Sequence, residues 1–214
     1  MCFVPYSTRL MCRILSWLDC GCDMLCHTRP PRGRKDMKPQ TITAGRLDIV
    51  YAYRGDHVIL TGPATVYHAG HCKFTRSGNW ARRSAPIIVN VAADARRFLE
   101  AVGVEPDEND AVILYKTLND AMVSGAQFGH TTSWEVGCTT VCDDWDYDWV
   151  GEGRALHLSP TKENAQQHYN YTNPDDVGGG TTYACRAFLH DVHLVPEDWT
   201  QYRCKQVTVL GEAT

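Results

Sequence analysis

The stretch Arg154-Ala155-Leu156-His157-Leu158-Ser159-Pro160 carries the strongest fold signal in the chain. Its two leucines alternate with polar neighbours, which is typical of a strand with one buried face. Ser159-Pro160 predicts a helix start, because a serine N-cap accepts a backbone amide hydrogen bond and proline suits the first helical position. Ala165 and Tyr169 then share one face of that helix. The stretch therefore predicts a strand that runs into a capped helix.

Strand signals lie on both sides of this junction. Before it, residues 111–116 form a branched apolar run, which is typical of a buried strand. After it, the glycines at 178–180 predict a turn, and two closing strands are expected at 183–189 and 205–210. We therefore expect residues 111–214 to form an α+β domain, with a mostly antiparallel (split) β-sheet and a few short helices.

Residues 37–110 are expected to form a β-rich N-terminal part with one helix. Short alternating runs separated by turn residues predict antiparallel strands of a β-meander, and no internal repeat is apparent. The helix is expected after Asp94 as its cap, with Gly103 as a left-handed stop. The polar segment 105–110 predicts the boundary to the next domain. The runs that predict strands are residues 47–53, 57–61, 64–68 and 86–91.

Residues 1–36 differ in composition from the rest of the chain. They hold six Lys/Arg against three Asp/Glu and five of the ten cysteines. Arg9, Arg13 and Asp19 interrupt the apolar residues, which argues against a signal peptide or a membrane span. We expect this segment to be dispensable, with translation starting at Met37 instead of Met1. A cysteine-rich metal-binding tail is the alternative.

Charge and cysteine spacing restrict the environment and the partners. The formal net charge of -4 argues against a nucleic-acid partner, because such proteins usually present a basic face. Beyond residue 37 the cysteines are widely spaced, which suits reduced thiols. The sequence therefore predicts a cytoplasmic protein with no membrane partner.

Three motifs resemble a family of uncharacterised phage and bacterial proteins over about the last 100 residues. The resemblance implies a phage-type protein of the host cytoplasm, with a host or phage protein as a partner, and it carries no established activity. The motifs are Ile113-Leu114-Tyr115-Lys116, Leu156-His157-Leu158-Ser159-Pro160-Thr161 with Ala165, and Tyr202-Arg203-Cys204-Lys205-Gln206-Val207-Thr208-Val209-Leu210.

At a greater distance the same features resemble the ADP-ribosyltransferase and RNA 2′-phosphotransferase superfamily, in which a split sheet holds NAD. That resemblance implies NAD as a cofactor and catalytic roles for His157 and Ser159 at the strand end. A rigid strand end beside a helix N-terminus suits a ribose and its phosphate. The cofactor-binding residues that it implies are Tyr115, Lys116 and Arg154.

Members of this superfamily also place a Glu or Gln near the last strands, where it stabilises the transition state. Glu197, Gln201 and Gln206 are the options here, and Gln206 is the expected catalytic residue. The alternative is an ordinary strand end followed by a Ser-Pro cap, with no catalytic role.

Two further functions remain open at this point. The acidic aromatic loop 143–149 presents Trp145, Tyr147 and Trp149, and it is a candidate surface by which a non-catalytic accessory protein binds a partner. A zinc-stabilised module is the other possibility, although the ligand spacing is not that of common zinc modules. No metal ligand is therefore assigned. The candidate zinc ligands are His68, His71, Cys72, Cys138 and Cys142.

Overall fold

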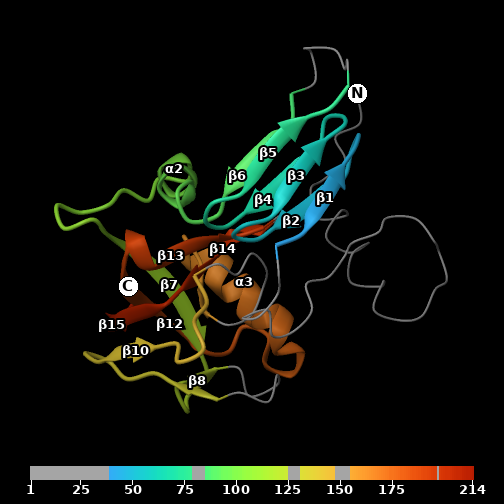
Figure 1. The fold of residues 1–214 in the computed structure, drawn as a ribbon. Helices are drawn as coiled ribbons and strands as arrows, with labels where there is room; N and C mark the ends of the chain where they lie inside the picture. Colours follow the sequence, from blue (N-terminus) through green and yellow to red (C-terminus); the bar gives the residue numbers. More distant parts are fainter. Residues whose placement is uncertain (1–38, 79–84, 125–130, 148–154, 197) are drawn as a thin grey trace.

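The computed structural model describes residues 39–78, 85–124, 131–147, 155–196 and 198–214. Strands dominate these residues, and α2 (Ala95–Ala101) and α3 (Lys162–Thr172) are their α-helices (Figure 1). The fold is a sheet-rich α+β arrangement in which some sheets are parallel and others antiparallel. No helix of the described ranges is long and apolar enough to cross a membrane.

The first half is a parallel coil, drawn from blue to green in Figure 1. Consecutive strands alternate between two three-stranded parallel sheets, and the Cα partners Thr41, His57 and Lys73 are spaced 16 residues apart. One sheet holds β1 (Thr41–Ala44), β3 (His57–Leu60) and β5 (Lys73–Arg76). The other sheet holds β2 (Ile49–Ala52), β4 (Thr65–His68) and β6 (Ile87–Asn90).

The predicted antiparallel meander is therefore wrong, and so is the expected absence of a repeat. In a meander each strand pairs with the next one, whereas here each strand pairs in parallel with the next but one. Small apolar side chains fill the space between the two sheets. The buried Asp56 carboxylate accepts the backbone amides of Gln40 and Tyr53, both at 2.9 Å, and so ties neighbouring turns together.

The predicted helix after Asp94 is present as α2, and Gly103 follows it with φ 83 in the left-handed region. The side chain of Asp94 does not cap the helix, because it accepts the amide of Asn90. Helix α2 is followed by the segment that leads into the second half of the chain.

Two antiparallel sheets form the second half. Residues 111–116 and the two predicted closing strands are strands, and residues 192–195 and 198–204 form two strands that the sequence did not predict. The first sheet has the order β10 (Thr139–Val141), β15 (Gln206–Glu212), β12 (Thr181–Phe188), β7 (Ala111–Leu118). The second has the order β11 (Leu156–Leu158), β14 (Asp198–Cys204), β13 (Val192–Val195). The remaining elements are the β8 (Val123–Ser124) and β9 (Thr132–Ser133) pair and the 3-10 turns η4 (Pro174–Asp176) and η5 (Leu189–Asp191).

Tyr115 and Ser159 join the two sheets. Their backbones exchange two hydrogen bonds, of 2.8 and 2.9 Å, just where β11 ends. The prediction that Ser159 caps the next helix is wrong, because Thr161 occupies that position and accepts the amide of Asn164 at 3.1 Å. The prediction that Ala165 and the tyrosine one turn later share a buried face is confirmed.

One hydrophobic core joins the parallel coil to the second half. It combines Tyr67, Val89 and Leu99 with side chains from the antiparallel sheets, among them Leu114 and Leu158. A backbone hydrogen bond of 2.8 Å from Leu194 to Val91 links the two halves directly. The coil therefore supports the sheets that carry the candidate site.

Candidate functional site

Lys116 points toward the core from the middle of β7. Side chains alternate along a strand, so Lys116 shares a face with the buried Leu114 and Leu118. Its Nζ lies 5.9 Å from the centre of the Trp134 ring, and no carboxylate of the described residues forms an ion pair with it. Burial lowers the pKa of Lys116 to about 8. Position 116 therefore holds a partly desolvated cation without an anionic partner.

His157 lies at the centre of β11, between two buried leucines, and is itself half-buried. Its Cα partner on β14 is the buried Arg203. Burial, together with the positive charges of Lys116 and Arg203, lowers the pKa of His157 to about 3. The imidazole is therefore neutral at neutral pH, and it lies near two cations.

His168 adds a second neutral imidazole to this cluster. It lies on α3, which packs against β7, and it is half-buried beside the buried Tyr169. Burial and the charge of Lys116, partly opposed by Asp198, lower the pKa of His168 to about 4. The charge of Lys116, on β7, therefore influences the pKa of two imidazoles that lie on two other elements.

Gln201 completes the cluster from β14. Its Nε2 donates to Asp198 Oδ2 at 2.8 Å, and its side chain opposes the lowering of the His157 pKa. Sequence reasoning weighed Gln201 but did not choose it, because β14 was not predicted as a strand. The pairing of this strand with β11 brings Gln201 to the histidine.

Two other predicted site residues, Tyr115 and Gln206, take different positions. Tyr115 precedes Lys116 on β7 and so points to the opposite side of that strand, the side of its bridge partner Ser159. Gln206 alternates with the buried Val207, so it points away from the core together with Thr208. No hydrogen bond among the described residues joins Gln206 to His157, and the catalytic role of Gln206 stays a prediction.

Of the two remaining predicted site residues, Ser159 and Arg154, the structure describes only Ser159. Ser159 is buried, with 3% of its surface exposed, and its backbone forms the junction with β7. This places it next to the cluster as a structural residue of the strand end. Arg154 lies outside the described residues.

The acidic aromatic loop packs against the same sheet. The Arg203 guanidinium lies 5.1 Å over the Trp145 ring, and the Trp145 and Tyr147 rings meet His193 edge to face at 4.9 and 4.6 Å. Burial lowers the pKa of Arg203 to about 10. Trp145 therefore contacts the protein itself, whereas Tyr147 remains 50% exposed. Trp149 lies outside the described residues.

Three of the five candidate zinc ligands make other contacts, and His71 and Cys138 are exposed. Cys72 Sγ donates to the Tyr53 carbonyl at 3.0 Å, and His68 Nδ1 lies 3.3 Å from the Gly70 carbonyl. Cys142 Sγ donates to Asp144 at 3.1 Å. Within the described ranges, no three His, Cys, Asp or Glu side chains are placed to hold a metal ion.

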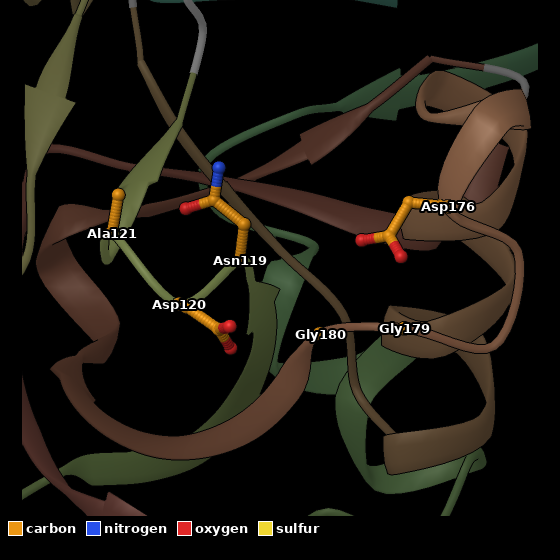
Figure 2. A pocket seen from close by; sticks show the side chains of 6 residues that line it. All are labelled: Asn119, Asp120, Ala121, Asp176, Gly179 and Gly180. Carbon is orange, nitrogen blue, oxygen red and sulfur yellow. The ribbon is translucent and has the colours of Figure 1, made fainter.

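Two surface hollows lie apart from the cluster. The hollow in Figure 2, of about 370 Å³, follows the end of β7, and the carboxylates of Asp120 and Asp176 face it above Gly179 and Gly180. Tyr169 donates to Asp176 Oδ2 at 2.5 Å. The second, of about 420 Å³, lies where the turns of the parallel coil meet η5. The acidic lining of the first makes it a poor site for an anion.

Comparisons with protein families, with curated proteins and with solved structures found no match. The function is therefore inferred from the side chains of the site.

Proposed function

We propose that Lys116, His157 and His168 bind an anionic nucleotide, with NAD as the first candidate. The observation that carries this proposal is the position of Lys116 on the core side of the sheet, where no carboxylate of the described residues forms an ion pair with it. A buried charge is costly unless it is compensated. A ligand phosphate would supply the missing charge and would accept a charge-assisted hydrogen bond.

The two imidazoles support the same ligand class. Both are neutral at neutral pH, so they add hydrogen-bonding atoms without repelling Lys116. All three side chains keep part of their surface exposed. A nucleotide offers both phosphate oxygens and ribose hydroxyls to such a set.

The resemblance to the ADP-ribosyltransferase superfamily supports NAD among the nucleotides. A mostly antiparallel split sheet would place a first-strand residue beside the His-x-Ser strand end, and Lys116 and His157 fit those positions. In this proposal Gln201 takes the place that Gln206 was expected to fill. The proposal concerns binding, and cleavage of NAD is the activity to assay once binding is established.

We also propose that the protein acts in the cytoplasm of the host, as the resemblance to phage-type proteins implies. The cysteines of the described ranges carry free thiols, which suits a reducing compartment. A host or phage protein remains the proposed macromolecular partner.

Thermal unfolding of the purified full chain with and without NAD tests the binding proposal. A ligand at roughly 100 times its Kd adds about 2.7 kcal/mol, or roughly 5–10 °C for a chain of this size. We expect such a shift for the wild type and none for His157→Ala. His71→Ala, an exposed histidine on the parallel coil, is the control and should shift like the wild type. The absence of any shift at millimolar NAD would contradict the proposal.

A further inference from the structure

The carboxylate of Asp198 orients the side chain of Gln201. Asp198 Oδ1 accepts the backbone amide of Thr200 at 3.0 Å and its hydroxyl at 2.6 Å, which holds the carboxylate in place. Asp198 Oδ2 accepts from Gln201 Nε2 at 2.8 Å. An ionised carboxylate only accepts hydrogen bonds, so the NH₂ group of Gln201 must face Asp198. The amide oxygen of Gln201 is then directed elsewhere.

His157 is within reach of that amide oxygen. Gln201 lies two positions before Arg203 on β14, and Arg203 is the Cα partner of His157, so the two side chains are diagonal neighbours. With its NH₂ group on Asp198, Gln201 can present only its amide oxygen to this neighbour. An amide oxygen only accepts, so a hydrogen bond between the two side chains has His157 as its donor.

We propose that Asp198 and Gln201 are positioning residues that hold His157 in a single neutral tautomer, with its N–H toward Gln201 and its other ring nitrogen free to accept a hydrogen bond from a ligand. In this arrangement Asp198 orients Gln201, and Gln201 in turn orients His157. The tautomer is a property of the unliganded protein. Only the role of the second nitrogen rests on the proposed nucleotide site.

The orientation has a chemical consequence for the site. Lys116 carries donors alone, and a neutral His157 in this tautomer adds an acceptor next to it. The site therefore combines a donor for an anionic group with an acceptor for a hydroxyl or amine proton. A ligand that carries both groups uses the whole site, whereas a simple anion uses Lys116 alone.

Nitrogen NMR of histidine-labelled full-length protein at pH 7 tests the tautomer, because the shifts of the two ring nitrogens distinguish the two neutral forms. We expect the His157 shifts of the wild type to be those of one pure tautomer. Gln201→Leu removes the acceptor and should move the shifts toward a mixture. Gln206→Leu removes an amide of the same size from the opposite face and should leave them unchanged.

A second variant covers the case in which Gln201→Leu does not fold. In Asp198→Asn the carboxamide can donate as well as accept, so Gln201 is free to flip, and we expect a mixed tautomer there as well. Averaged shifts in the wild type, or unchanged shifts in both folded variants, would overturn the proposal.

Failure of the nucleotide proposal gives a different result. If His157 holds one tautomer in the wild type and loses it in Gln201→Leu, the positioning role stands even when NAD causes no thermal shift. If NAD does bind, we expect Gln201→Leu to weaken it about tenfold and Gln206→Leu to have no effect. Equal affinity for both variants would overturn the role of the second nitrogen.

Discussion

The ammonium group of Lys116 faces the Trp134 ring at 5.9 Å, on the core side of the sheet. An aromatic ring attracts a cation, but less strongly than a carboxylate in the same place would. The lysine is therefore held in a position that costs stability in the unliganded protein. Sites that bind a ligand commonly carry such a cost.

Replacement of Lys116 by methionine should stabilise the unliganded protein. Methionine has a similar length and carries no charge, so we expect a gain of about 1 kcal/mol, or about 3 °C. The pKa of Lys116 is about 8 in the folded chain and 10.5 when unperturbed. Between these values the folded wild type loses a proton that the unfolded chain keeps, so its stability rises with pH. The gain from Lys116→Met should therefore shrink from pH 7 to pH 9.5 in thermal unfolding. A gain that stays constant or grows over this range would show that the lysine is not desolvated.

His193 should make the protein sensitive to acid. It is fully buried, neither ring nitrogen has a hydrogen-bond partner among the described residues, and burial lowers its pKa to about 3. Below pH 6.5 His193 becomes protonated in the unfolded chain but stays neutral in the folded chain, so the free energy of unfolding falls as the pH drops. The loss from this residue is about 2 kcal/mol between pH 6.5 and pH 5.

His193→Phe should reduce that loss, because a phenyl ring keeps the edge-to-face contacts with Trp145 and Tyr147 and does not titrate. Urea unfolding at pH 7 and pH 5 measures the change. The loss of unfolding free energy between pH 7 and pH 5 should become smaller in this variant but should not vanish, since His157 and His168 titrate in the same direction. His71→Ala is the control, and an equal change in that variant would contradict the assignment.

Gly180 should not tolerate a side chain. Its φ is 73, and a Cβ there would lie 2.8 Å from the Leu118 carbonyl and 2.9 Å from Tyr169 Cζ. We expect Gly180→Ala to cost about 3 kcal/mol. Gly178 has a similar φ of 79 but open space around it, so Gly178→Ala should cost about 1 kcal/mol. Chemical denaturation of both variants makes the comparison, and equal losses would mean that the close approach at Gly180 is not rigid.

Local patterns in the sequence predicted several elements correctly. The branched run at 111–116 and the alternation of 156–158 are signals of single strands, and both strands are present. The left-handed conformation of Gly103 after α2 and the buried face of α3 were also predicted from local patterns. These features depend on a few neighbouring residues, so one sequence is enough to predict them.

Features that depend on pairing were not predictable in the same way. Short alternating strands with turns suit a meander and a parallel coil equally, and only the 16-residue spacing of Val50-Tyr51-Ala52 and Val66-Tyr67-His68 distinguishes the coil. The sequence of β14 contains polar residues such as Gln201 and Arg203, so it lacks the apolar pattern that predicts a buried strand. Arg203 is nevertheless buried, because its guanidinium stacks on the Trp145 ring. The choice between Gln201 and Gln206 likewise depends on which face each side chain takes.

Calorimetric titration of NAD at pH 7 into the wild type, Lys116→Gln and Lys205→Gln tests the nucleotide site most directly. Lys205 is exposed at the turn between β14 and β15, so its variant loses the same charge away from the site. A charge-assisted hydrogen bond contributes about 1.5–3 kcal/mol. We predict that Lys116→Gln weakens binding by at least about tenfold, whereas Lys205→Gln binds like the wild type. Equal affinity in Lys116→Gln and the wild type, or no binding to the wild type at millimolar NAD, would contradict the assignment.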